Sequence, residues 1–403
     1  MTPLDAPSLL FVPSSEIENR LRSLQELMSQ EGLDAVLICQ NVDLFYFSGT
    51  MQPGFLYIPS QDEPIFFSRK NMDRALEESP LTNVIALSSS KAVPALLAER
   101  GLLPPQVLGL EMDVLPANIF VQLQNIFKDT RLLDASILIR KCRMIKSSWE
   151  IENMIRSAQM MTAMVSEVTK ILKPGMIEIE LAGQIEAFLR KEGHQGFTRM
   201  RGFNQEIVYG HVLSGPEGLK ASYIDAPTGG AGLGPAFSQG AGVKPIRPKE
   251  PISVDSVGCY NGYFVDQTRM FSLGQPAQEV TKAFQALLKI QESVVQRAQP
   301  GVPCEQVYFW AHEEAGRLGY RNQFMGMDRN RVSYIGHGVG LELDELPVIG
   351  QKFNWPLEPG MVLALEPKIF LSGHGLVGLE NTYHMTDSGL ERLTTAPDDY
   401  QIL

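Results

Sequence analysis

The segment VDSVGCYNGYFVDQTR, residues 254–269, carries two aspartates whose spacing could hold a cation. Asn261-Gly262 is a strong signal for a two-residue β-hairpin loop, because both residues tolerate the positive φ of a type I′ turn. Such a loop places Asp255 and Asp266 on one face of the hairpin, on a diagonal with Cα atoms roughly 7–8 Å apart. Two acids that converge in an apolar setting need a cation or a shared proton between them. The alternative is that each aspartate only binds turn backbone or caps a strand edge.

Three further segments place a histidine or a glutamate in an apolar, strand-like context. They are SYIGHGVGLELDELP with His337, GMVLALEPKIF with Glu366, and GLVGLENTYHM with Glu380. A carboxylate that a strand carries into the interior needs a partner. The turn-prone SGHG between the two glutamates predicts that Glu366 and Glu380 lie on neighbouring antiparallel strands.

Together these segments offer four carboxylates and one imidazole. This oxygen-rich set suits two divalent ions of the Mn, Fe, Co or Zn kind. Two such ions, typically about 3.5–4 Å apart, can share a bridging hydroxide as nucleophile and polarise a carbonyl oxygen.

The composition is that of a globular protein without a nucleic-acid or membrane partner. The formal net charge is −11, from 35 Lys+Arg against 46 Asp+Glu, which disfavours nucleic acid and anionic membrane. The four cysteines form no CxxC motif, so neither a disulfide framework nor a thiolate zinc site is indicated. The first residues, MTPLDAPSLLFVPSSE, lack the basic start of a secretory signal, and no apolar run is long enough for a bilayer. We therefore expect a soluble, cytoplasmic protein.

The chain length and the pattern of elements predict two domains. At 403 residues the chain exceeds the usual size of one core. Its opening reads as a helix capped by Ser14 or Ser15 and closed at Gly32, followed by a strand at 35–39, which begins an α/β domain over residues 1–143. Ser147 or Ser148 can cap a long amphipathic helix that opens a second domain over residues 144–403.

The second domain is expected to hold the chemistry. Helices are predicted at about 179–191, 278–297 and 304–318, and strand-like runs around 361–371 and 376–386. The Gly-rich region 210–245 reads as an ordered loop over the site, because no P-loop lysine follows it.

Nearly the whole chain resembles the superfamily of Xaa-Pro aminopeptidases, prolidases and methionine aminopeptidases. RLRSLQELMSQEGLDAVLICQNVDLFYFSGT resembles the opening of its creatinase-like N-terminal domain, and IRKCRMIKSSWEIENMIRSAQ resembles its interdomain region. The four motifs VDxxGxxxGYxxDxTR, GHGxGL, LEP and LEN match its pita-bread catalytic domain in order. The resemblance implies an α/β (α+β) fold with a creatinase-like N-terminal domain and a pita-bread C-terminal domain.

The resemblance also implies the metal ligands. Asp255 would bind one ion, His337 and Glu366 would complete the other, and Asp266 and Glu380 would bridge. Manganese is the first expectation, with cobalt, iron or zinc as alternatives.

The chain departs from the family pattern at several positions around this set. Gln239 and Asp344 stand where family peptidases carry histidines, Gly378 where many carry an arginine, and Ser333 where many carry a further histidine. A glutamine cannot titrate, whereas a protonated Asp344 could donate a hydrogen bond or act as general acid. We assign Gln239 and Asp344 to substrate contact and catalysis, and take His211 as the best spatial substitute for a missing histidine.

The segment between Ser214-Gly215 and Gln239 is longer than the family pattern leads us to expect. It contains Tyr223, Asp225 and a Gly-rich run. We expect it to reshape the pocket wall, with a plain surface loop as the alternative.

These features predict a homodimeric metallohydrolase that cleaves a short peptide or small amide. A metal-bridging hydroxide would attack the carbonyl, and Glu366 would relay the proton. The alternatives are a creatinase-like hydrolase or lyase acting on a small non-peptide substrate, and a catalytically silent binding protein.

Overall fold

The computed structural model describes residues 10–403, which form two compact units. One unit runs to Arg143 and the other comprises Met144–Leu403. Most of the N-terminal stretch that argued against a secretory signal lies outside the described residues. Within the described residues, no helix combines the length and apolar character needed to cross a bilayer.

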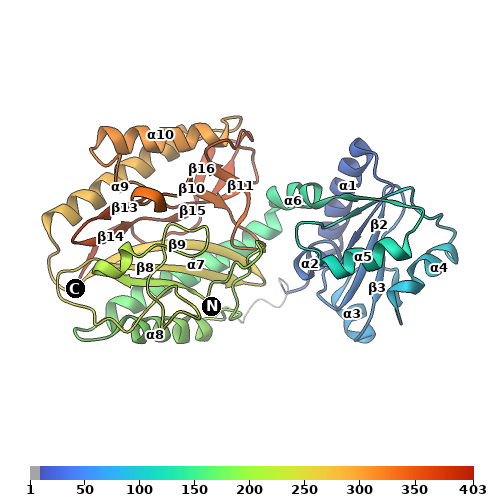
Figure 1. Ribbon diagram of the computed structural model, residues 1–403, viewed down its shortest axis with the longest axis horizontal. Coiled ribbons are helices and arrows are strands. Elements are labelled where there is room, and N and C mark those ends of the chain that lie inside the picture. Colours follow the sequence, from blue (N-terminus) through green and yellow to red (C-terminus); the bar gives the residue numbers. More distant parts are fainter. Residues whose placement is uncertain (1–9) are drawn as a thin grey trace. The chain divides into compact units, whose positions relative to one another are not determined.

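The N-terminal unit is a six-stranded mixed sheet with helices around it (Figure 1). The strand order is β4-β3-β2-β1-β5-β6, in which β1 pairs antiparallel with β2 and parallel with β5. The strands are β1 Ala35–Ile38, β2 Gly54–Pro59, β3 Ile65–Ser68, β4 Val84–Ala86, β5 Val107–Leu110 and β6 Arg131–Asp134. The helices are α1 Ser14–Glu31, α2 Asn41–Ser48, α3 Met72–Glu78, α4 Val93–Ala98, α5 Ala117–Ile126 and α6 Ser136–Met144.

The ends of α1 test the predicted caps. Gly32 closes the helix with a left-handed φ of 68°, as predicted. The predicted serine cap is wrong, because Pro13 holds the N-cap position and Ser14 lies in the first turn. The Ser14 hydroxyl instead donates to Glu18 Oε1 at 2.8 Å.

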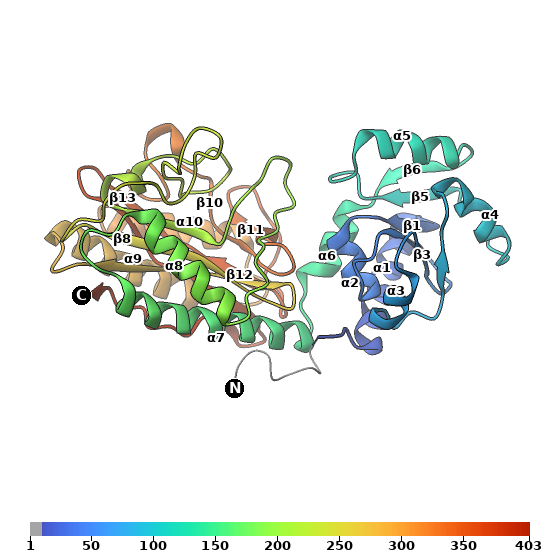
Figure 2. The same ribbon diagram turned by 90° about the horizontal axis from the view of Figure 1, so that it is seen from below.

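The C-terminal unit places strands between two pairs of helices. Helices α7 and α8 lie on one side of the strands, and α9 and α10 on the other (Figures 1 and 2). The predicted cap of α7 is confirmed, since Ser147 and Glu150 form a capping box. The helices are α7 Ser148–Ile171, α8 Glu178–Lys191, α9 Gln278–Arg297 and α10 Cys304–Arg317.

The strands of this unit form three sheets, in the orders β17-β9-β8-β7, β11-β10-β12-β15-β16 and β13-β14. Their bounds are β7 Gly210–Ser214, β8 Ile252–Tyr260, β9 Tyr263–Ser272, β10 Tyr334–Gly338, β11 Glu345–Gly350, β12 Val362–Leu365, β13 Lys368–Leu371, β14 Gly375–Gly378, β15 Asn381–Thr386, β16 Gly389–Arg392 and β17 Gln401–Ile402.

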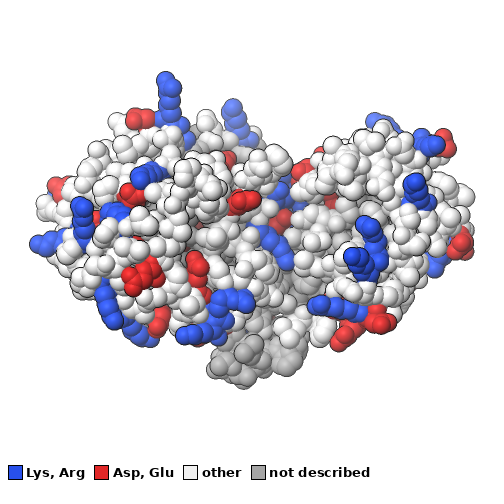
Figure 3. Space-filling model, turned by 60° about the horizontal axis from the view of Figure 1, so that its bottom comes forward, with Lys and Arg blue, Asp and Glu red and all other residues white. Residues whose placement is uncertain are grey.

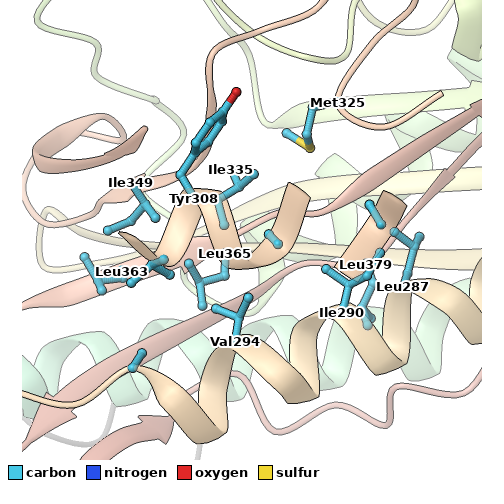
Figure 4. Packing of buried hydrophobic residues seen from close by; sticks show 14 of the residues in the cluster. Leu287, Ile290, Val294, Tyr308, Met325, Ile335, Ile349, Leu363, Leu365 and Leu379 are labelled. Carbon is cyan, nitrogen blue, oxygen red and sulfur yellow. The ribbon is translucent and has the colours of Figure 1, made fainter. Parts of the chain in front are cut away.

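Apolar side chains of α9 pack against the strands that end at the candidate site (Figure 4). Ile290 and Val294 of α9 and Leu365 of β12 belong to one buried cluster. Burying such a side chain contributes roughly 1.5–3 kcal/mol each. Gln291 of α9 also donates from Nε2 to the Leu365 carbonyl at 3.2 Å, which fixes the end of β12.

Candidate metal centre

The β8–β9 hairpin presents the two aspartates as predicted. Asn261 and Gly262 have positive φ values of 49° and 81° and join the strands directly. Asp255 stands opposite Thr268, and the diagonal position opposite Val257 belongs to Asp266, so the predicted register is confirmed. Both aspartates are buried.

The two glutamates lie at breaks between strands. Glu366 separates β12 from β13, and Glu380 separates β14 from β15. The strands on either side of the glutamates are antiparallel neighbours, β12 with β15 and β13 with β14. The prediction that Glu366 and Glu380 themselves lie within neighbouring strands is wrong, because both lie between strands. Pro367 lacks the N–H that would continue the ladder past Glu366, and the chain leaves one sheet for the other there.

His337 lies in β10, between β11 and β12, with its ring orientation set by a second acid. Its Nδ1 lies 3.2 Å from Asp344 Oδ1 and 3.1 Å from the Gly338 carbonyl. Burial alone would lower the pKa of His337, but Asp344, Glu366 and Glu380 outweigh it and raise that pKa. Partners on Nδ1 leave Nε2 as the atom that faces the carboxylates, a typical arrangement for a metal-binding histidine.

Three of the predicted ligands converge closely enough to hold one ion. Asp266, His337 and Glu380 each offer an atom, and these atoms lie within 4.8 Å of one another. Glu380 Oε2 accepts a 2.8 Å bond from the Thr268 hydroxyl, whereas the buried Glu380 Oε1 has no hydrogen-bond partner. Burial, together with nearby carboxylates, raises the pKa of Glu380 to about 8. A divalent ion bound here would satisfy the orphaned oxygen and offset the repulsion, so the donor set fits one ion.

A lysine that sequence analysis did not single out occupies the other half of the predicted site. Lys368 is buried, and its Nζ lies 2.5 Å from Glu366 Oε2, 3.1 Å from Asp255 Oδ2 and 3.5 Å from Glu380 Oε2. Burial would lower the pKa of Lys368, but these carboxylates outweigh it and raise that pKa well above its usual value. With the ammonium in this place, Asp255 and Glu366 do not fit a second divalent ion.

A pocket opens beside the candidate ligands, and its lining includes Asp255, Asp266, His337 and Glu366. Residues 224–228 form part of its wall, as predicted for the long segment after Ser214.

His211 also lines this pocket. Its Nδ1 lies 2.9 Å from Thr228 Oγ1, and its buried Nε2 has no hydrogen-bond partner. Burial lowers the pKa of His211 to about 4, so the ring is neutral near pH 7. A neutral ring with a free nitrogen suits a hydrogen bond to a bound molecule.

Asp344 and Gln239, which the sequence resemblance assigned to substrate contact and catalysis, occupy different surroundings. Asp344 lines the pocket and reaches His337. Gln239 is buried and accepts a 2.8 Å hydrogen bond from the Ser222 hydroxyl, but it is not among the residues that line the pocket.

Arg269, a residue whose role sequence analysis did not predict, holds the Glu380 turn in place. Its guanidinium is buried and donates to the Glu380 carbonyl at 2.7 Å and to Asn381 Oδ1 at 2.7 Å. Further bonds reach the carbonyls of Thr268, Ala396 and Pro397.

Residues 152–387 match metallopeptidase family M24, and residues 20–145 match the creatinase/prolidase N-terminal domain. The first match alone covers more than half of the chain. This chain belongs to metallopeptidase family M24. The predicted family, the α/β fold and the order of an N-terminal creatinase-like domain before a pita-bread domain are thereby confirmed. As an M24 member, the protein is a metallopeptidase-like hydrolase.

Individual relatives match more than nine tenths of the chain. A Xaa-Pro dipeptidase of Pyrococcus furiosus is 26% identical over 382 residues, which cover 94% of this chain and 98% of that protein. The structure of a Xaa-Pro dipeptidase from Bacillus anthracis superposes with a TM-score of 0.81 at 24% identity, covering 96% of this chain and all of that one. That of an X-Pro aminopeptidase from Thermotoga maritima gives a TM-score of 0.77 at 24% identity, covering 92% of this chain and 98% of that one. At these identities the structural matches establish the fold alone.

Proposed function

We propose that this M24 chain hydrolyses the amide bond of a short peptide, of the Xaa-Pro type, or of another small amide. One observation carries the proposal: ligand atoms of Asp266, His337 and Glu380 converge within 4.8 Å beside a pocket, and a buried Glu380 oxygen lacks a partner. Relatives named Xaa-Pro dipeptidase support the peptide as substrate class.

Asp266, His337 and Glu380 would hold a divalent ion, which when bound supplies a Lewis acid that polarises the scissile carbonyl. Asp344 keeps His337 in its ligating orientation through the 3.2 Å contact with Nδ1. Glu366 lines the pocket and is the proton acceptor for the attacking water. Its Oε2 is engaged by the Lys368 ammonium at 2.5 Å, so Oε1 takes the proton. The predicted second ion and bridging hydroxide would require Lys368 to leave these carboxylates.

His211 is the proposed substrate contact. His211 lines the pocket, and its neutral ring has an unpartnered Nε2 that can bond a peptide amide or carbonyl without changing charge. Asp344 remains a proposed substrate contact through its position on the pocket wall.

Manganese as the native ion, a homodimer and a cytoplasmic location remain predictions. The same holds for the absence of nucleic-acid and membrane partners. On the face shown in Figure 3, Lys and Arg are interspersed with Asp and Glu, so that face presents no broad basic patch of the kind that binds nucleic acid.

A substrate screen tests the proposal. The metal-free protein is loaded with Mn²⁺, Co²⁺, Fe²⁺ or Zn²⁺ and incubated with Xaa-Pro dipeptides and tripeptides, and the released amino acid is measured. We expect metal-dependent hydrolysis that Asp266→Asn abolishes and that Glu279→Gln, at an exposed acid in the first turn of α9, leaves unchanged. Hydrolysis that persists in Asp266→Asn or without any metal would refute the proposal.

A second candidate function is that of a creatinase-like hydrolase or lyase acting on a small non-peptide substrate. It is favoured by Asp344, which stands where family peptidases carry a histidine and is committed to His337. Bound metal with no turnover of any peptide in the screen would select this alternative.

A further inference from the structure

The Lys368 ammonium is placed as an ion would be. It contacts three carboxylates contributed by β8, the β12–β13 break and the β14–β15 break, at 3.1, 2.5 and 3.5 Å. The side chain is 1% exposed, so water cannot replace these contacts. Such an arrangement of one buried cation among several acids is stable only when the acids lie close and bind it directly.

The fold makes room for this lysine. On the two-stranded sheet Lys368 stands opposite Gly378. A Cβ added at Gly378 would lie 3.3 Å from Lys368 Cγ and 3.2 Å from Thr268 Cγ2, closer than packed carbon atoms normally approach. The absent side chain at Gly378 thus leaves the channel through which the lysine stem reaches the acids.

We propose that Lys368 is a built-in cation that takes the place of one divalent ion, so that the chain binds a single ion at Asp266, His337 and Glu380. Nζ binds Asp255 Oδ2 and Glu366 Oε2, so an ion shared by these two residues would find only one oxygen of each without the ammonium. It would also lie against a positive charge in a buried site, where charges repel strongly.

The count of charges agrees with this arrangement. The site has four carboxylates, on Asp255, Asp266, Glu366 and Glu380, and one ammonium. With one dication bound, the four carboxylates, the ammonium and the ion together carry a single negative charge. Two dications together with the ammonium would leave the buried site positive.

The inference rests on the proposed function only in taking Asp266, His337 and Glu380 as ligands, and metal binding tests it without an activity assay. The full-length chain is stripped with a chelator, loaded with Mn²⁺ and desalted, and bound metal is counted by mass spectrometry. We expect one ion per chain in the unsubstituted protein and an electron paramagnetic resonance spectrum of isolated Mn²⁺. Two ions per chain, or a spin-coupled spectrum, would overturn the inference.

Two variants sharpen the test. Lys368→Ala removes the ammonium and is expected to bind two ions. Arg143→Met, which breaks the buried 2.7 Å pair with Asp43 in the N-terminal unit, is expected to bind one. A folded Lys368→Ala that still binds one ion would contradict the proposal.

Asp255→Asn provides a test that does not depend on the folding of Lys368→Ala. If Asp255 binds only the ammonium, the variant keeps one ion with unchanged Mn²⁺ affinity. A tenfold or greater loss of Mn²⁺ affinity is the size seen when residues that support a metal are removed. Such a loss would mean that Asp255 holds or supports an ion rather than only the ammonium. One bound ion without peptide hydrolysis would refute the proposed function and leave this inference standing, and hydrolysis with two ions would do the reverse.

Discussion

Replacing Lys368 with alanine should destabilise the metal-free protein strongly. The substitution removes contacts at 2.5, 3.1 and 3.5 Å and leaves three buried carboxylates facing one another. Removing one partner of a buried pair costs about 3–5 kcal/mol of unfolding free energy. At about 2–4 °C per kcal/mol for a domain of this size, the melting temperature should fall by roughly 10 °C.

Added Mn²⁺ should then restore part of the loss, because a divalent ion can replace the ammonium. A ligand at one hundred times its Kd stabilises the folded state by about 2.7 kcal/mol per site. The variant would gain this amount at two sites and the unsubstituted protein at one, so the difference between them should shrink by about 2.7 kcal/mol.

The assay is chemical denaturation with and without Mn²⁺, followed by circular dichroism. Arg143→Met is the matched control, since it breaks another buried pair, with Asp43 of the N-terminal unit, and added Mn²⁺ should not restore the stability that it loses. Metal-free Lys368→Ala as stable as the unsubstituted protein, or equal recovery in both variants, would refute the reasoning.

Three other substitutions test neighbouring parts of the account. Asp344→Asn should weaken Mn²⁺ binding by about 10–100-fold in a calorimetric titration, because the charged partner of His337 Nδ1 is lost. Unchanged affinity would show that Asp344 does not support His337 as a metal ligand. Arg269→Met should lower the unfolding free energy by about 3–5 kcal/mol, since it leaves buried acceptors without donors; a loss below about 1 kcal/mol would show that the Glu380 turn does not depend on it. Burial lowers the pKa of His211 from 6.5 to about 4, so the unfolded chain binds more protons in this window, and stability should decline as pH falls from about 6.5 to 4. His211→Gln should flatten that part of the pH–stability curve, and a curve identical to that of the unsubstituted protein would contradict the assignment.

Local signals predicted the hairpin, the end of α1 at Gly32 and the start of α7 at Ser147. Asn261-Gly262 determines the loop, and with it the register that places Asp255 and Asp266 on one face. The capping box of Ser147 and Glu150 likewise lies within a few residues of sequence. These features depend on neighbouring residues, so a single sequence contains what is needed to find them.

Two prolines overturned expectations about where elements begin and end. The glutamates were expected within strands, but Pro367 cannot continue the hydrogen-bond ladder of β12, and the chain enters a second sheet at β13. Pro13 displaced the predicted serine cap of α1.

Lys368 was missed, although it follows Glu366 by two residues, the spacing that brings side chains to one face of an extended chain. Its role depends on Asp255, more than one hundred residues earlier, and on the bare backbone of Gly378 across the sheet. A lysine in an otherwise apolar strand next to an acid was the signal that could have found it.

The most direct test of the account is the anomalous scattering of manganese in crystals grown with excess Mn²⁺. We predict one anomalous peak per chain, within bonding distance of Asp266, His337 and Glu380, with Lys368 Nζ still bound to Asp255 and Glu366. A second peak between Asp255 and Glu366, with the lysine displaced, would contradict the single-ion centre. Absence of any peak at the three ligands would contradict the metal centre itself.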